Sequence, residues 1–193
     1  MTESDRSLRD RLVDAGVELV AAEGAPALTL REIARRAGVS HGAPRRYFPT
    51  HLELLSAIAH RGFTALAGRA REALGDGTAA PGAQVAALGR VYLEFARDNT
   101  GMYELMFRHD LLESGHLRLR ETSLPLFGLL ADLVGRARPG VDARLVAGAL
   151  WANLHGIAQL WSWGSLRLAT GTVDPEPLLH SALDAHLGPV TSR

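Results

Sequence analysis

The sequence contains no cysteine and no lysine, and only 6% of its residues are aromatic. Without cysteine the chain has no disulfide, no thiolate nucleophile and no cysteine-ligated zinc. It also lacks an uninterrupted apolar run of the ~20 residues that span a bilayer, and no charged-then-apolar leader lies between Met1 and Gly24. Apolar residues still make up 47% of the 193, which is enough to bury a core. We therefore expect a soluble, cytoplasmic protein that makes no membrane contact.

The common motifs of catalysis are absent too: the sequence has no GxSxG, no phosphate-cradling glycine motif and no HExxH. The nearest candidate for a metal site is His109, Glu113 and His116, whose four- and three-residue spacing would suit a metal ion on one helix. Gly115 interrupts that helix, and exposed polar residues at a helix end are the commoner explanation. We predict no enzyme activity, no metal and no cofactor, and metal analysis of the purified protein tests this.

The formal net charge is zero, but it is unevenly distributed. Between Thr29 and His51 five arginines face one acid, Glu32, which gives this stretch a charge of +4 and leaves −4 for the rest of the chain. The five are Arg31, Arg35, Arg36, Arg45 and Arg46. Such a local concentration of positive charge is typical of a nucleic-acid contact, although it also occurs on a solvated helix face.

Apolar residues recur at helical spacing through the whole chain, and no sustained alternation indicates strands. The fold class is therefore all-α. The first helix should run from about Ser4 to Glu23 and end at Gly24. Thr29 and Glu32 form a capping box for a short second helix, and a tight turn at residues 38–40 follows it. Ser40 is then the expected N-cap of a third helix that ends near Tyr47.

A second capping box, Thr50 to Glu53, starts a long fourth helix. Helix, glycine turn and helix make a helix-turn-helix, here within a small three-helix unit. The Gly-, Ala- and Pro-rich segment 75–82 predicts a domain boundary, with a helix-turn-helix domain at 1–73 and a ligand-binding and dimerisation domain at 83–193. Further helices are expected at about 83–98, 100–107, 115–136, 141–165 and 174–187, the last one N-capped by Asp174.

The third helix has the composition of a DNA-reading helix. Gly42 and Ala43 are small and allow close approach, while His41, Arg45, Arg46 and Tyr47 are long and polar. Arginine suits both guanine edges and phosphates, and the pattern does not say which role each arginine takes. A helical adaptor that binds an acidic protein is the alternative, and a preference for one DNA sequence over another would exclude it.

The stretch LTLREIARRAGVSHGA (28–43), followed by YFP (47–49) and LELL (52–55), closely resembles the TetR family of bacterial regulators. The resemblance implies a homodimer that represses from a near-palindromic operator in double-stranded DNA and is released by a small-molecule effector. It places Thr29 and Ser40 near phosphates and residues 41–47 on the recognition helix. His51 stands where the family often has lysine, so we expect a weaker phosphate contact there. The expected DNA-binding residues are Thr29, Ser40, His41, Gly42, Arg45, Arg46, Tyr47 and His51.

The helix expected at 141–165 is apolar almost all round, so it should be covered on more than one side. Gly148, Ala152 and Gly156 form a stripe of small residues at four-residue spacing. Packing inside one subunit would account for the stripe, and so would a dimer interface with the 174–187 helix, to which we add Leu179 and Leu183. The family resemblance favours the dimer.

Trp151, His155 and Gln159 lie on another stripe of the same helix, and the polar groups of His155 and Gln159 need partners. We interpret this stripe as a pocket wall for a largely hydrophobic ligand. Ordinary core packing is the alternative for each aromatic residue or methionine, and the family's known cavity favours the pocket. The proposed lining is Tyr92, Phe95, Met102, Tyr103, Met106, Phe107, Phe127, Trp151, His155 and Gln159.

Overall fold

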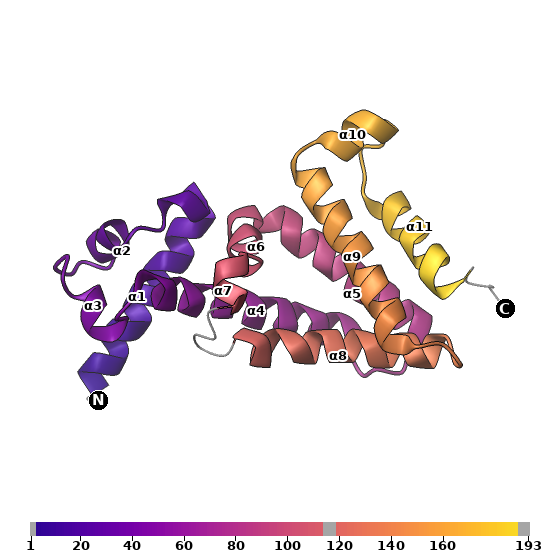
Figure 1. The fold of residues 1–193 in the computed structure, drawn as a ribbon, viewed down its shortest axis with the longest axis horizontal. Coiled ribbons are helices and arrows are strands. Elements are labelled where there is room, and N and C mark those ends of the chain that lie inside the picture. Colours follow the sequence, from indigo (N-terminus) through magenta and orange to yellow (C-terminus); the bar gives the residue numbers. More distant parts are fainter. Residues whose placement is uncertain (1–2, 114–118, 189–193) are drawn as a thin grey trace. The chain divides into compact units, whose positions relative to one another are not determined.

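The computed structural model describes residues 3–113 and 119–188, and within these ranges the chain is helical and contains no strand (Figure 1). The elements are α1 (Glu3–Glu23), the 3-10 turn η1 (Ala25–Ala27), α2 (Leu30–Arg36), α3 (Pro44–Tyr47), α4 (His51–Leu74), α5 (Pro81–Asp98), α6 (Thr100–Met106), α7 (His109–Glu113), α8 (Leu119–Ala137), α9 (Ala143–Ser162), α10 (Ser165–Thr170) and α11 (Glu176–Leu187). The all-α fold class predicted from the sequence is confirmed.

The helices form two compact units. The first contains the residues up to Ala65 together with Asn99–Ser123, and the second contains Leu66–Asp98 and the residues from Leu124 onward. The predicted boundary segment 75–82 therefore lies inside the second unit, as a loop up to residue 80 and the start of α5, and the domain limits 1–73 and 83–193 stay a prediction. The chain passes from one unit to the other within α4, between α5 and α6, and within α8.

The first unit is built around the apolar stripe of α1. Leu12 and Leu19 are fully buried, and α1 packs on α2, α3 and α6. Two glycines allow this close packing. A Cβ on Gly101 would lie 2.6 Å from the carbonyl oxygen of Val20, and one on Gly16 would lie 2.3 Å from the Ile58 side chain. Glycine is needed at position 101, where a side chain would push against backbone, whereas at position 16 a side chain would require the Ile58 side chain to shift.

In the second unit α9 packs on α5, α10 and α11 (Figure 1). Gly89 of α5 lets Leu179 of α11 approach closely, because a Cβ there would lie 2.7 Å from the leucine side chain. At the edge of this contact Arg90 donates from Nε to Glu176 Oε2 at 3.1 Å. The same ion pair lowers the pKa of the Glu176 carboxyl, chiefly through the side-chain hydrogen bond. These contacts fix α11 along α5 and α9.

The C-terminal helices differ from the sequence prediction in two places. The helix expected at 141–165 ends at Ser162, because Gly164 adopts φ 76° and starts the separate short helix α10. The helix expected at 115–136 runs from Leu119 to Ala137 where it is described, and residues 115–118 lie outside the described residues. The last helix begins at Glu176 with Pro175 as its N-cap residue, so the predicted Asp174 N-cap is wrong by one position, although Asp174 Oδ1 accepts from Glu176 N at 2.9 Å.

Candidate nucleic-acid interface

Helix α2 is held at both of its ends. Thr29 Oγ1 accepts from Glu32 N at 3.2 Å, so the predicted N-cap is confirmed. At the other end Arg11 of α1 donates to the carbonyl oxygen of Ala37 at 2.6 Å. Gly38 follows with φ 69°, the left-handed conformation that the predicted tight turn requires. The orientation of α2 on α1 is therefore fixed by side chains as well as by packing.

Helix α3 begins at Pro44 with Ala43 as its N-cap, three residues later than predicted, and Ser40 is not its N-cap. The reason is the missing N–H of proline, because Pro44 cannot donate to the Ser40 carbonyl four residues before it. That carbonyl instead accepts from Ala43 N at 3.0 Å, which closes a tighter turn. The helix is thus a single turn, preceded by an exposed loop that carries His41 and Gly42.

The end of α3 is anchored by Phe48, which is 2% exposed. The guanidinium of Arg9 from α1 lies over the Phe48 ring, with Cζ 4.9 Å from the ring centroid, and makes a cation–π contact. Arg9 and Arg11 therefore both connect α1 to the helix-turn-helix. Sequence reasoning missed these two contacts, since neither arginine belongs to a recognisable motif.

The start of α4 confirms the Thr50 side-chain cap of the second predicted capping box. Thr50 Oγ1 accepts from Glu53 N at 3.1 Å and lies 3.3 Å from Glu53 Oε1. The ring of His51 has a local partner, because its Nε2 lies 2.6 Å from the carbonyl oxygen of Leu28. A carbonyl only accepts, so this nitrogen carries the proton. The bond joins the first residue of α4 to the segment that leads into α2.

The five arginines of the basic stretch fall into two groups. Arg35 donates from Nε to Glu32 at 2.8 Å, and Arg36 donates to Glu23 at 2.8 Å. The side-chain bond from Arg35 lowers the pKa of the Glu32 carboxyl. By contrast, the other three are exposed and pair with no acid among the described residues. These are Arg31, Arg45 and Arg46.

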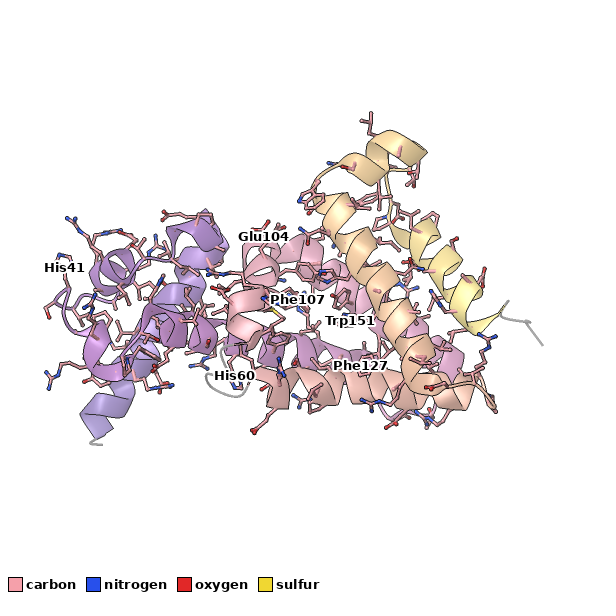
Figure 2. The ribbon with its side chains drawn as sticks, in the orientation of Figure 1. His41, His60, Glu104, Phe107, Phe127 and Trp151 are labelled. Carbon is pink, nitrogen blue, oxygen red and sulfur yellow. The ribbon has the colours of Figure 1, made fainter. Side chains whose placement is uncertain are left out.

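The predicted DNA-binding residues all lie in one segment of the first unit. Thr29, Ser40, His41, Gly42, Arg45, Arg46 and His51 are exposed, and Tyr47 is half-buried. A Cβ on Gly42 would meet nothing within 4 Å, and Figure 2 shows His41 projecting outward between α2 and α3. The structure places these residues where a large ligand can reach them, and their contacts with DNA stay a prediction.

An open groove of about 560 Å³ lies between α1 and α4 in the same unit. Its charged groups are largely satisfied locally, since Arg61 approaches Asp14 at 3.3 Å and Asp10 at 4.0 Å. His60 Nδ1 lies 3.1 Å from Thr122 Oγ1. The lining residues are Arg9, Asp10, Val13, Ala57, His60, Arg61 and Thr64.

The second unit brings together four of the predicted pocket residues, Tyr92, Phe127, Trp151 and His155. Trp151 Nε1 donates to the Tyr92 hydroxyl at 3.2 Å, and that hydroxyl lies 2.8 Å from His155 Nδ1. The Phe127 and Trp151 rings pack edge to face with centroids 6.2 Å apart. Both side chains are labelled in Figure 2. Burial lowers the pKa of His155, so its imidazole is neutral at pH 7.

The remaining predicted pocket residues have other surroundings. Gln159 is half-buried one turn beyond His155, and Phe95 is buried with the Arg69 guanidinium 5.3 Å from its ring. Four belong to the first unit, where Met102, Tyr103 and Met106 are buried and the Phe107 and Phe63 rings lie 5.8 Å apart. A role for any of the ten in ligand binding stays a prediction.

The predicted dimer residues separate into two sets. Leu179 and Leu183 are 0% and 5% exposed inside a single chain, so their assignment to the interface is wrong. The physical reason is that α11 turns its apolar face towards α5 and α9 of its own chain. Gly148, Ala152 and Gly156 do lie on the outer side of α9, and a Cβ on either glycine would meet nothing within 4 Å.

The described part of the chain contains no cluster of acidic and histidine side chains arranged to hold a metal ion. Of the predicted trio, His116 lies outside the described residues. Within the same part, no helix is long and apolar enough to cross a membrane.

Comparison with known proteins agrees with the helix-turn-helix architecture. Residues 12–58 match the model described as "Bacterial regulatory proteins, tetR family", and residues 85–186 match "Tetracyclin repressor-like, C-terminal domain". The second match covers more than half of the chain. The chain therefore belongs to the TetR family, whose members are DNA-binding transcriptional regulators and not enzymes.

Individual proteins are similar to this chain in sequence or in fold. The HTH-type transcriptional regulator TtgW of Pseudomonas putida, itself uncharacterised, is 43% identical over 53 residues, which are 28% of this chain and only 40% of that protein. A protein of unknown function from Rhodococcus sp. RHA1 superposes with a TM-score of 0.79 at 27% identity, over 93% of both chains. The multidrug binding protein EbrR, complexed with imidazole, superposes with a TM-score of 0.59 at 26% identity, over 95% of this chain and 96% of its own.

Proposed function

We propose that this TetR-family regulator is a homodimeric repressor in the cytoplasm, which binds a palindromic operator and leaves it when a small, largely hydrophobic molecule binds. The observation that carries the DNA half of the proposal is a set of outward arginines, without acidic partners among the described residues, on a helix-turn-helix whose helices are capped and anchored. Three cations that no described acid neutralises are available to phosphates and guanine edges.

The residues proposed to touch DNA are the eight predicted from the sequence, and the structure suggests different roles for them. Arg45 and Arg46 lie on α3 and would enter the major groove, together with His41 and Gly42 from the loop before it. Thr29 and His51 lie at helix starts and would approach phosphates by way of the amides there. Since the ring of His51 is also bonded to the carbonyl oxygen of Leu28, it would help to orient these amides.

The ligand half of the proposal depends on the group formed by Tyr92, Phe127, Trp151 and His155. Two aromatic faces and a chain of three polar groups suit a mainly apolar molecule that exchanges one or two hydrogen bonds with the protein. EbrR, similar in fold, is described as a multidrug binding protein. For ligand binding to release DNA, the ligand must bind the DNA-incompetent arrangement more tightly than the DNA-bound one.

Fluorescence anisotropy tests the DNA half. DNA from upstream of the protein's own gene is titrated at physiological salt, with a scrambled duplex of the same length and composition as the control. We expect tight binding to the first duplex alone. Equal, weak binding to both leads to selection of bound fragments from the whole genome, and the proposal is wrong if that selection enriches no sequence.

Release by small molecules tests the ligand half in the same assay. A panel of apolar compounds with one polar group is added to the protein–operator complex, and any hit is repeated on Tyr92→Phe and on His155→Gln. We expect the hit to release the wild type at lower concentration than either variant, because both lose a polar group of the proposed site. A hit that releases all three proteins at the same concentration would place the effector site elsewhere.

A further inference from the structure

Arg144, near the start of α9, adds a positive charge to the aromatic group of the second unit. Its guanidinium lies over the Phe127 ring, with Cζ 5.5 Å from the ring centroid. Phe127 packs edge to face with Trp151, whose indole donates to the Tyr92 hydroxyl. That hydroxyl lies 2.8 Å from His155 Nδ1. A continuous series of contacts therefore joins one cation to two aromatic rings and to the polar groups of Tyr92 and His155.

The members of this series that belong to α9 share one face of the helix. Trp151 and His155 follow Arg144 by seven and eleven residues, which are close to whole numbers of turns. Trp151 lies ~10 Å from Arg144 along the helix axis, and His155 lies ~16 Å from it. Trp151 is 40% exposed, and a Cβ on Gly148, one turn after Arg144, would meet nothing within 4 Å. The face therefore has a cation at one end, polar groups at the other, and room beside it.

Stacking on Phe127 leaves the edge of the Arg144 guanidinium available. A cation–π contact uses the flat face of the group, whereas its N–H donors lie in the plane and point outward. Arg144 is exposed and forms no ion pair and no side-chain hydrogen bond with any described residue. The acid nearest to it in the sequence, Asp142, caps α9 instead, since its Oδ1 accepts from Arg144 N and Leu145 N at 3.1 Å. The ring thus positions a guanidinium whose donors no described acceptor uses.

Most other arginines of the second unit are already bonded. Those whose guanidinium groups pair with an acid, an amide or a carbonyl group are Arg69, Arg71, Arg90, Arg97, Arg136 and Arg138. Arg167 resembles Arg144, because it lies over the Trp161 ring with Cζ 5.9 Å from the centroid and has no described acidic partner. Trp161 makes no ring contact with another described aromatic residue, so Arg167 is a matched control outside the aromatic group.

The charges and donors of the group favour an anionic ligand. Burial lowers the pKa of His155, so its imidazole adds no positive charge at pH 7 and Arg144 supplies the cation. Arginine and tryptophan side chains only donate hydrogen bonds. A carboxylate only accepts, and its two oxygens fit two parallel N–H bonds from the edge of a guanidinium. An apolar molecule that ends in a carboxylate therefore matches Arg144 at one end and Phe127 and Trp151 along its length.

We propose that the effector is a hydrophobic monocarboxylate, with its carboxylate on the guanidinium edge of Arg144 and its apolar body on Phe127 and Trp151. The inference rests on the proposed release by a small molecule and names the chemical class of that molecule. A neutral isostere loses the charge-assisted bonds, and an apolar amine meets a like charge at Arg144. The single cation at one end of an apolar site thus determines which hydrophobic molecules bind.

Calorimetric titration of the free protein tests the ligand class without DNA. The probes are the straight-chain carboxylates from hexanoate to dodecanoate and the phenyl-substituted acids from phenylacetate to phenylbutyrate, used below micelle-forming concentrations. Each acid is compared with its own primary amide, which has the same apolar body and no charge. We expect at least one acid to bind ~10-fold or more tightly than its amide, because hydrogen bonds to a charged group are the stronger ones. If no acid of the series binds more tightly than its amide, the proposal is wrong.

Substitution of Arg144 locates the carboxylate. Arg144→Gln should abolish the preference for acid over amide, whereas Arg167→Gln, which removes an equivalent stacked charge, should keep it. Arg144→Lys should restore part of the preference, because an ammonium group keeps the charge but not the paired donors. Arg144→Glu should reverse it, so that decylamine binds more tightly than decanoate. The assignment is overturned if Arg144→Gln keeps the preference, or if it and Arg167→Gln lose it equally.

These outcomes are distinguishable from a failure of the proposed function. Calorimetry reports ligand binding to the free protein, and anisotropy reports operator binding independently. An acid that binds through Arg144 in a protein for which no operator is found supports the ligand class and overturns the proposed regulation. An operator complex that amides release and acids do not overturns the ligand class and leaves the proposed function intact.

Discussion

Replacing Arg45 and Arg46 one at a time by alanine should reduce operator binding strongly and leave the fold unchanged. Both guanidinium groups are exposed on α3 and pair with no acid in the described chain. Loss of an arginine that reads a base costs about 1–3 kcal/mol, or roughly 5- to 150-fold in the dissociation constant per half-site. Unfolding free energy should change by less than about 0.5 kcal/mol, because neither side chain is part of the core.

Arg35→Ala is the matched control. Arg35 lies on α2 of the same helix-turn-helix, and its removal changes the net charge by the same amount, but its guanidinium is bound to Glu32. We expect its effect on operator binding to be clearly smaller than that of Arg45→Ala or Arg46→Ala. Equal losses in all three variants would show that net charge, and not the unpaired arginines of α3, determines affinity.

The salt dependence of the same titrations separates the two roles an arginine can have. If the lost contact was to phosphate, the slope of log K against log salt should fall by about 0.9 per phosphate, with equal losses on operator and scrambled DNA. If it was to a base, the slope should stay and the loss should appear on the operator alone. Full operator binding by both variants would refute the assignment of α3 as the recognition element.

Three further predictions concern stability and assembly. Gly101→Ala should lower the unfolding free energy by about 1–3 kcal/mol in chemical denaturation, because the added Cβ would lie 2.6 Å from a backbone carbonyl oxygen. The control is Gly68→Ala in α4, where a Cβ meets nothing within 4 Å and the change should be neutral or stabilising. Equal effects of the two substitutions would contradict the packing described for Gly101. Gly148→Leu or Gly156→Leu should give a folded monomer in sedimentation, and a retained dimer mass would remove the outer side of α9 from the interface. Because burial lowers the pKa of His155, the unfolded chain binds that proton at higher pH, so stability should fall as pH drops below ~6.5 towards the folded value. His155→Gln should lose this component, and unchanged pH dependence would refute it.

The helix-turn-helix could be predicted from sequence because its signals are local. Thr29 and Thr50 each cap a helix through a residue three positions on, and both caps are found in the structure. The prediction that Ser40 is an N-cap was wrong, because Pro44, four residues later, has no amide N–H to donate to the Ser40 carbonyl oxygen. The preference of serine for the N-cap position was thus overridden by the missing N–H of a nearby proline.

The long-range contacts were beyond such reasoning. Nothing adjacent to Arg11 indicates that it binds a carbonyl 26 residues away, and nothing adjacent to Leu179 distinguishes a core face from an interface face. Helical periodicity identifies an apolar face but not what covers it. The group of Tyr92, Trp151 and His155 could be predicted only in part. The four-residue spacing of Trp151 and His155 places them on one face of their helix, but their contact with Tyr92 could be seen only in the folded structure.

The way the chain alternates between its two units limits how it can be re-engineered. Hybrid sensors are commonly designed by joining the DNA-reading part of one regulator to the sensing part of another at a loop. In this chain the glycine-rich loop at 75–80, which the sequence suggests as the place to cut, lies inside the second unit. There Gln84 Nε2 donates to the carbonyl oxygen of Gly77 at 2.7 Å. A graft there would separate residues 99–123 from the unit in which they pack. A working chimera must carry that segment with the DNA-reading part, as a second exchanged piece.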